Sequence, residues 1–159
     1  MAVDRDHPAV ARVRAALEAA GSPAEVVWLD DAASTAALAA DALGIEVGAI
    51  ANSLVFLLDG EPVLVMTSGA HRVDTEWLGA QLGGTFSRAD ATTVKDATGQ
   101  VIGGIAPLGH PAPLRTFVDS SLADYPEIWA AAGHANTVFP LSYAQLVAIT
   151  SGTVTPVVA

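Results

Sequence analysis

Hydrophobic residues recur every three or four positions in several segments of the chain, the spacing of one face of an α-helix. The first such segment carries this face on Ala9, Val10, Val13 and Leu17. Gly21-Ser22-Pro23 then ends the run. Polar residues that can cap a helix begin the other segments, and glycines follow most of them. The pattern predicts helices over residues 8–20, 35–43, 74–82, 90–97 and 142–149.

Short runs of β-branched and aliphatic residues lie between the predicted helices. The strongest are SLVFLL at residues 53–58 and PVLVMT at residues 62–67, which Asp59-Gly60-Glu61 joins as a hairpin. We also expect strands at residues 25–29, 115–118, 128–132 and 137–139, and coil over residues 150–159. Short, partly hairpin-linked strands favour an α/β fold of the mixed α+β kind, a mixed sheet or small barrel flanked by helices. Without a repeat or linker, residues 1–159 are expected to form a single domain.

Composition places the chain among folded proteins and narrows its surroundings. Hydrophobic residues make up 52% of the 159 residues and charged residues 15%, which excludes disorder. Cysteine is absent, so the chain has no disulfide, thiol nucleophile or cysteine metal site. No continuous apolar segment occurs in the start, MAVDRDHPAV, and no window approaches the roughly 18 apolar residues of a spanning helix. We therefore expect a cytoplasmic protein with no membrane partner.

The net charge of −10 limits the partners that the chain can bind by electrostatics alone. Lys95 is the only lysine, and residues 21–66 contain seven acids and no basic residue. Phosphate contacts need clustered lysine and arginine, so the charge argues against DNA binding and predicts weak unaided binding of any polyanion. An anionic ligand would have to be held by backbone amides, by a few arginines, or with the help of a second protein.

Common catalytic motifs are absent from the sequence. It contains no P-loop, no G-x-G-x-x-G motif and no G-x-S-x-G serine elbow. The four histidines show no metal-ligand spacing, so we expect neither a metal nor a cofactor. His71 and Asp74 could form a base with its orienting acid, although Asp74 as a helix cap is the preferred interpretation. For His110 the choice stays open, because a conformationally fixed loop is a suitable place to present an imidazole.

Four groups of residues occur in an order and spacing that point to one family. The first consists of Thr35, Ala39, Leu43 and Gly44. AIANSLVF with its hairpin partner VLVMTSG follows, then GGIAPLGHP, and finally TFVDSSL with WAAAGHANTVFPLS. Together, over residues 25–149, they resemble the YbaK/ProX-type domains of aminoacyl-tRNA editing proteins. The resemblance implies a mixed, barrel-like sheet flanked by helices, and hydrolysis of the ester that joins a wrong amino acid to the 3′ end of a tRNA.

The G-x-x-x-P loop of that family corresponds to Gly103-Gly104-Ile105-Ala106-Pro107. Glycine lets the main chain approach a ligand and proline fixes the backbone, so such a loop can direct N–H groups at a developing oxyanion. On the loop alone, a structural turn between two strands is an equal alternative. The resemblance implies catalytic roles for Asn52, Gly103, Gly104 and Pro107. It further implies substrate contacts for Ser53, Ile105, Ala106, Gly109, His110 and Asp119.

One position departs from the family pattern. Members with editing activity usually carry a lysine before the run [ST]-L-[VI]-F, and Asn52 occupies that position here. An amide can donate and accept hydrogen bonds, but it brings no positive charge.

The resemblance implies a deacylase that acts in trans on tRNA mischarged with a small amino acid such as alanine or cysteine. Its expected partners are the mischarged tRNA 3′ end, bound weakly by the chain alone, and prolyl-tRNA synthetase or another synthetase. Two alternatives stay open: a non-catalytic module that binds an aminoacyl or nucleotide ligand, and a domain that docks on a synthetase.

Overall fold

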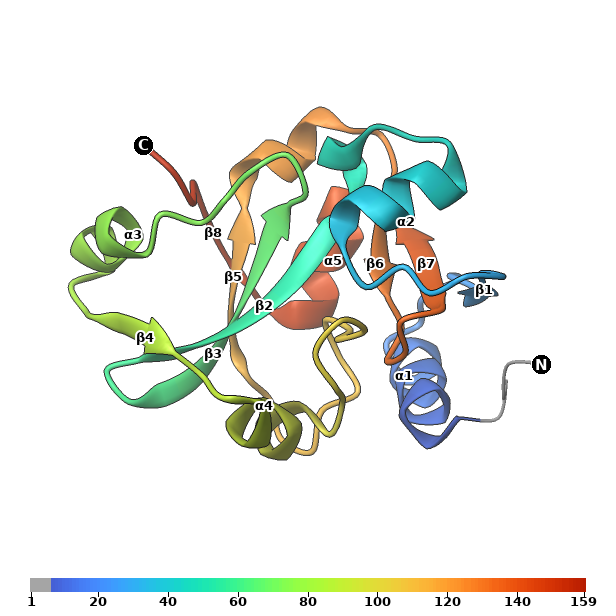
Figure 1. Cartoon of the computed structure of the whole chain (residues 1–159), viewed down its shortest axis with the longest axis horizontal. Helices are drawn as coiled ribbons and strands as arrows, with labels where there is room; N and C mark the ends of the chain where they lie inside the picture. The colour runs from blue at the N-terminus through green and yellow to red at the C-terminus, as the bar shows by residue number, and fades with distance from the viewer. Residues whose placement is uncertain (1–6) are drawn as a thin grey trace.

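The computed structural model describes residues 7–159. The first six residues lie outside it. They belong to the N-terminal segment that is predicted not to be a signal peptide. Its helices are α1 (Pro8–Ala19), α2 (Ala36–Leu43), α3 (Thr75–Leu82), α4 (Ala91–Thr98) and α5 (Tyr143–Thr150) (Figure 1). Its strands are β1 (Val27–Trp28), β2 (Ala51–Leu58), β3 (Glu61–Ser68), β4 (Phe86–Arg88), β5 (Arg115–Asp119), β6 (Ile128–Ala131), β7 (Thr137–Leu141) and β8 (Thr153–Thr155). None of the helices in this described part is long and apolar enough to cross a membrane.

The strands form two sheets, and neither closes into a barrel. The larger sheet has the order β4-β2-β3-β5-β8 and the smaller one the order β1-β7-β6. β4, β2 and β3 are antiparallel neighbours, whereas β3, β5 and β8 run parallel. The predicted mixed α+β fold is confirmed, and of its two forms the open mixed sheet is the one present. Within residues 7–159 one isolated bridge, between Ile50 and Trp129, connects the two sheets.

Local hydrogen bonds define the helix ends where the sequence predicts them. In α2 to α5, the side chains that accept a hydrogen bond from a backbone N–H of the first turn are those of Thr35, Asp74, Asp90 and Ser142. In α1 the His7 side chain accepts from the Ala9 N–H. Gly44, Gly83 and Gly99 end α2, α3 and α4 in the left-handed conformation. Because these contacts join residues close in sequence, the predicted helices agree with the structure to within one residue at each end.

The prediction of coil over residues 150–159 is wrong in part, because this segment contains a strand. Thr153–Thr155 form β8, which pairs in parallel with β5. Val157, just beyond it, is fully buried, and its carbonyl accepts a hydrogen bond from the Asp74 N–H. The three-residue strand β4 was not predicted either. Strands this short show no usable alternation, and distant segments of the chain supply their pairing.

Each face of the larger sheet packs against a separate hydrophobic core. Leu64 and Met66 of β3 face the main core, which includes residues of α1, α4, α5 and the smaller sheet. Val63 and Val65 of the same strand face a second core with Leu78 of α3 and the C-terminal tail. Figure 1 shows α3 beside the free end of the β2–β3 hairpin and α5 behind the sheets.

Candidate functional site

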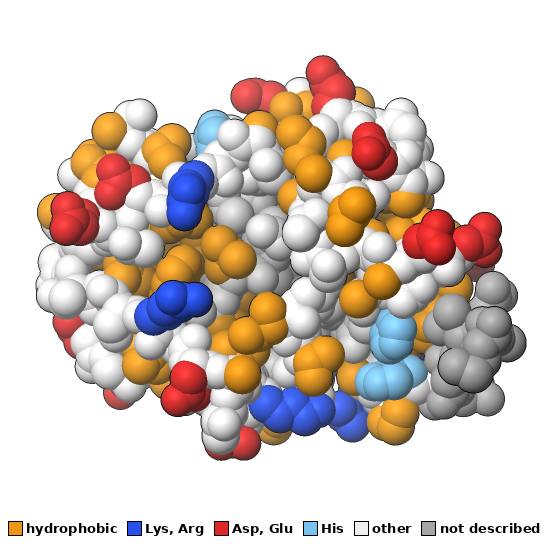
Figure 2. All heavy atoms as spheres, viewed as in Figure 1, with side chains coloured by type: hydrophobic (Ala, Val, Ile, Leu, Met, Phe, Trp, Pro, Cys, Tyr) orange, Lys and Arg blue, Asp and Glu red, His pale blue; other side chains and the backbone are white. Residues whose placement is uncertain are grey.

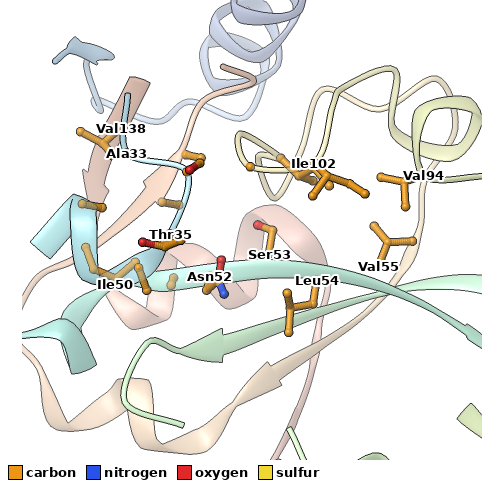
Figure 3. Close-up of a pocket in the computed structure, with 18 of the residues that line it drawn as sticks. Ala33, Thr35, Ile50, Asn52, Ser53, Leu54, Val55, Val94, Ile102 and Val138 are labelled. Carbon is orange, nitrogen blue, oxygen red and sulfur yellow. The ribbon is translucent and has the colours of Figure 1, made fainter. Parts of the chain in front are cut away.

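A cavity of about 370 Å³ lies where the two sheets diverge from the Ile50–Trp129 bridge. The edge of β2 forms one wall and strands β6 and β7 contribute another (Figure 3). The rest of the lining comes from residues 33–36 and Ala39 before and within α2, residues 88–89, Val94 of α4, and Ile102, Gly103 and Ile105 in and beside the glycine-rich loop. Most lining side chains are small or apolar, and Arg88 is the one charged residue found there in the part of the chain described.

β2 lines the cavity with six consecutive residues, 51–56. Figure 3 shows Ser53 and Val55 on the side of the strand that faces Ile102, whereas Leu54 points to the other face. The Ser53 hydroxyl donates a hydrogen bond to Met66 Sδ at 3.2 Å. Asn52 lines the same cavity, and its carboxamide has no hydrogen-bond partner within residues 7–159. This amide is therefore available to a ligand.

The glycine-rich loop presents alternate residues to the cavity. Gly103 and Ile105 line it, whereas Gly104 and Ala106 do not. The Gly104 N–H donates to a carbonyl of the same loop at 3.2 Å, and the Ala106 N–H donates to Gln100 Oε1 at 2.7 Å. The N–H groups of Gly103 and Ile105 have no acceptor among the described residues. The two residues that reach the cavity therefore keep their backbone donors free.

Close packing accounts for the two adjacent glycines of this loop. Gly103 has a φ of +99°, and a Cβ added to it would lie 3.2 Å from Ser34 Cβ. A Cβ added to Gly104 would lie 2.5 Å from the carbonyl carbon of His134 and 2.7 Å from the Ala135 nitrogen. Gly104 thus sets the loop against the backbone of residues 134–135, and Gly103 faces the cavity.

Gln100 and His110 hold the inner side of the loop. The Gln100 side chain is buried, accepts from the Ala106 N–H and donates to the Leu108 carbonyl at 3.2 Å. His110 Nε2 donates to the Ala106 carbonyl at 2.9 Å. Gln100 was not among the residues predicted for the site. The signal for it was a polar residue directly before the apolar run that begins at Val101, three positions before the G-x-x-x-P motif.

Acid is expected to destabilise the fold through His110. Burial lowers the pKa of this imidazole, and the hydrogen bond to the Ala106 carbonyl opposes the shift only in part. The unfolded chain therefore binds a proton near pH 6.5 while the folded chain does so at lower pH. The free energy of unfolding contributed by neutral His110 is complete above pH 6.5 and is lost as pH falls towards the folded pKa. Thermal unfolding should show a Tm decrease from pH 7 to pH 5 that is smaller in His110→Gln, and equal decreases would contradict this.

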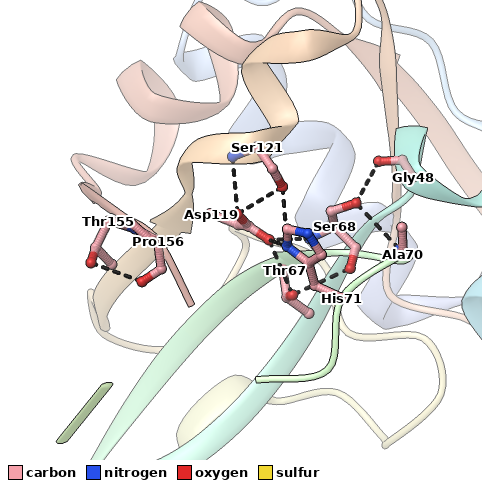
Figure 4. Close-up of polar contacts among 9 residues, drawn as sticks. All are labelled: Gly48, Thr67, Ser68, Ala70, His71, Asp119, Ser121, Thr155 and Pro156. Carbon is pink, nitrogen blue, oxygen red and sulfur yellow. Dashed lines mark hydrogen bonds and ion pairs between the residues drawn. The ribbon is translucent and has the colours of Figure 1, made fainter. Parts of the chain in front are cut away.

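Asp119 lies outside the cavity lining, in a polar cluster at the ends of β3 and β5 (Figure 4). It accepts hydrogen bonds from the N–H groups of Ser68 and Ser121, both at 3.0 Å, and from the Ser121 hydroxyl at 2.8 Å. His71 Nδ1 lies 2.9 Å from Asp119 Oδ2. Burial alone would raise the pKa of Asp119, but these hydrogen bonds lower it below its usual value. The cluster thus holds a buried carboxylate.

His71 does not pair with Asp74. The Asp74 side chain accepts from the Trp77 N–H at 3.0 Å, so its interpretation as a helix cap is confirmed. His71 contacts Asp119 instead. No group of three or more potential metal ligands occurs among residues 7–159.

The residues predicted for the site fall into three places. Asn52, Ser53, Gly103 and Ile105 line the cavity together. Five further residues, in the glycine-rich loop or just after it, do not line the cavity: Gly104, Ala106, Pro107, Gly109 and His110. Asp119 belongs to the separate polar cluster. The chemical roles assigned to all of them stay predictions.

Comparison with known proteins connects this geometry to a family. Residues 30–149 match the family profile described as the aminoacyl-tRNA editing domain. A solved structure of a candidate trans-editing enzyme for prolyl-tRNA synthetase is 38% identical, with a TM-score of 0.89 over 94% of this chain and 96% of that one. The structure of hypothetical protein APE2540 is 25% identical, with a TM-score of 0.84 over 92% and 98% of the two chains. The uncharacterized protein YwhH of Bacillus subtilis (strain 168) is 26% identical over 123 residues, which is 77% of this chain and 78% of that protein.

Proposed function

The chain belongs to the family of aminoacyl-tRNA editing domains, and on that premise we propose that it hydrolyses, in trans, the ester bond of a mischarged aminoacyl-tRNA. The observation that carries the proposal is the pair of free backbone donors on Gly103 and Ile105, which line the same cavity as Asn52 and Ser53. This arrangement suits an ester whose carbonyl oxygen develops negative charge, because fixed N–H donors stabilise such an oxyanion.

The proposed reaction needs little side-chain chemistry. A water molecule adds to the ester carbonyl carbon, and the electron pair of the C=O bond moves to oxygen, where the loop donors stabilise the charge. The tetrahedral intermediate then collapses, the C=O bond re-forms, and the ribose oxygen is expelled and takes up the proton that the attacking water releases. The neighbouring ribose hydroxyl of the substrate itself can orient the water. An activated ester held in this way requires no histidine or carboxylate in the cavity lining.

The substrate that we propose carries a small amino acid such as alanine or cysteine. The cavity has to accept the ester and part of the terminal ribose within its volume of about 370 Å³. Alanines and other small side chains from α2, β6 and their flanks line the remainder. A long or branched aminoacyl side chain would have to displace this wall, whereas the methyl group of alanine or the CH2SH group of cysteine would not.

The terminal phosphate and a second protein are the further contacts that we propose. Arg88 lines the cavity, is exposed, and has no ion pair within residues 7–159, so its guanidinium is available to a phosphate. Figure 2 shows a few basic side chains on this face, beside a hollow and along the lower edge, while acidic side chains are spread along the upper, right, left and lower-left edges. Because basic side chains are so few, we propose that a synthetase helps the chain to bind tRNA. Similarity to a candidate trans-editing enzyme for prolyl-tRNA synthetase favours prolyl-tRNA synthetase as that partner.

The decisive experiment is single-turnover deacylation on a panel of correctly charged and mischarged tRNAs, including alanyl- and cysteinyl-tRNAPro. We expect hydrolysis of at least one mischarged tRNA and no hydrolysis of the correctly charged tRNA. A second function is favoured by Asn52, since the usual lysine is replaced: a module that binds the aminoacyl end without turnover. If no tRNA of the panel is hydrolysed and a non-hydrolysable aminoacyl-adenosine still binds, the second function is favoured.

Substitutions of Asn52 test how much the side chain at this position contributes. Asn52→Ala should slow single-turnover deacylation by about 10²-fold or less, because it removes one supporting hydrogen bond and leaves the backbone donors in place. Asn52→Lys should raise activity on at least one mischarged tRNA, because it restores a positive charge beside the ester. A loss well beyond 10²-fold in Asn52→Ala would mean that the amide, and not the loop, carries the main stabilisation.

A further inference from the structure

The cavity has no acidic residue with which to bind the positive end of its proposed substrate. An aminoacyl ester carries an α-ammonium group next to the reacting carbonyl. The one charged side chain of the lining is a cation, Arg88, and no aspartate or glutamate from the described residues lines the cavity. An ammonium group in this site therefore has to be bound by uncharged acceptors, of which carbonyl oxygens are the strongest.

β2 offers such acceptors because its second edge is only partly paired. β3 covers the first edge along the whole strand, from Ala51 to Leu58. On the second edge β4 pairs only with Phe56–Leu58, and the smaller sheet, although β6 runs close to β2, forms a bridge only at Ile50. No described strand pairs with the second edge at residues 52–55, which are among the β2 residues that line the cavity.

The alternation of hydrogen bonds along β2 identifies the residues whose backbone groups face this gap. The Ile50 carbonyl accepts from the Gly69 N–H on the β3 side, and the Asp59 N–H donates to the Thr85 carbonyl on the β4 side. Successive residues of an antiparallel strand direct their backbone groups to opposite edges. Even-numbered residues of β2 therefore bond to β3, and the two odd-numbered residues in the gap, Ser53 and Val55, direct their N–H and C=O groups to the cavity side. Of these two, Ser53 is the one next to Asn52.

We propose that Ser53 binds the aminoacyl group as one residue of an added antiparallel strand. The Ser53 carbonyl accepts a hydrogen bond from the α-ammonium group, and the Ser53 N–H donates to the ester carbonyl. An amino acid carries its nitrogen and carbonyl in the arrangement with which a peptide adds to a sheet edge. The second lone pair of the ester oxygen stays available to Gly103 or Ile105. This inference rests on the proposed function for the choice of ligand, and it identifies the α-amino group as a required recognition element.

The test uses a pair of non-hydrolysable ligands, so it does not depend on turnover. Adenosine bearing a 3′-alanylamide carries the ammonium group, and the 3′-lactoylamide replaces it with a neutral hydroxyl of similar size. A charge-assisted hydrogen bond should make the alanyl ligand bind wild type at least about tenfold more tightly at pH 6.5. Raising the pH to 9.5 should remove most of this preference by deprotonating the amine. Equal affinities at pH 6.5, measured by titration calorimetry or NMR, would overturn the proposal.

Proline substitutions test the direction of the Ser53 N–H. Proline is tolerated in a strand only where its missing N–H points away from the ladder. Ser53→Pro should therefore fold with a much smaller decrease in Tm than Leu54→Pro, which removes a bond to β3. Relative to Ser53→Ala, Ser53→Pro should also weaken the alanyl ligand about tenfold. Equal Tm losses in the two proline variants would overturn the assignment, because the Ser53 N–H would then belong to the sheet.

If wild type prefers the alanyl ligand but hydrolyses no tRNA of the panel, the binding role of Ser53 stands and the enzymatic function fails. If it hydrolyses mischarged tRNA and shows no preference for the alanyl ligand, the function stands and this inference fails.

Discussion

Gly103→Val is expected to abolish deacylation, with a rate loss of at least about 10³-fold in single turnover. Two effects of the substitution act together. The φ of +99° at this position is one that a β-branched residue adopts only with strain, so the loop has to shift. The new side chain also enters the cavity beside Ser34, where the ester has to lie. Both effects displace the free N–H donors from the reacting carbonyl.

Gly60→Val is the matched control for this substitution. Gly60, in the β2–β3 turn, has a φ of +86°, and no atom lies within 4 Å of a Cβ added there. Valine should therefore cost a similar free energy of unfolding, roughly 1–3 kcal/mol, without filling the cavity. We expect Gly60→Val to lower the Tm and keep the deacylation rate of its folded fraction. Near-wild-type deacylation by folded Gly103→Val would show that the ester does not bind beside this loop.

Asp119→Ala is expected to lower the free energy of unfolding by about 3 kcal/mol, the largest stability loss that we predict for a single polar side chain. The substitution leaves the Ser68 and Ser121 N–H groups without their acceptor at a site that is almost fully buried. It also removes the closer of two contacts to His71 Nδ1, Asp119 Oδ2 at 2.9 Å, and leaves only the Ser121 hydroxyl at 3.3 Å. Urea unfolding followed by circular dichroism measures the loss directly.

Asp124→Ala provides the comparison, because Asp124 is an exposed acid on the turn that follows Asp119. Its removal should change the free energy of unfolding by no more than about 0.5 kcal/mol. A substrate contact was predicted for Asp119, and this pair of variants tests that prediction too. Unchanged stability with lost deacylation in Asp119→Ala would favour the substrate contact over the structural role.

The parts of the fold that could be predicted are those determined by neighbouring residues. Thr35, Asp74, Asp90 and Ser142 bond to backbone groups of their own first turn, so a cap is visible in a few letters of sequence. The hairpin of β2 and β3 was predictable for the same reason. In contrast, β8 depends on β5, and no local pattern specifies a parallel partner from another part of the chain.

The candidate site divides in the same way. The glycine-rich loop was predictable because close backbone approach demands glycine, and Gly103 and Ile105 do line the cavity. The contribution of Gln100 was not, because its two hydrogen bonds to the loop depend on how the chain folds back on itself. The gap along β2 was not predictable either, since it results from where β4 and the smaller sheet stop pairing.

The parallel pairing of β8 with β5 also bears on how the chain is made. β8 follows every other strand of the larger sheet in the order of synthesis. Until it leaves the ribosome, the nascent chain exposes the outer edge of β5 and lacks Val157, which completes the second core. Open strand edges pair readily with other chains, so this stage is the one at which aggregation competes with folding. The unprotected edge of β5 is therefore where we expect a chaperone of nascent chains to bind this protein.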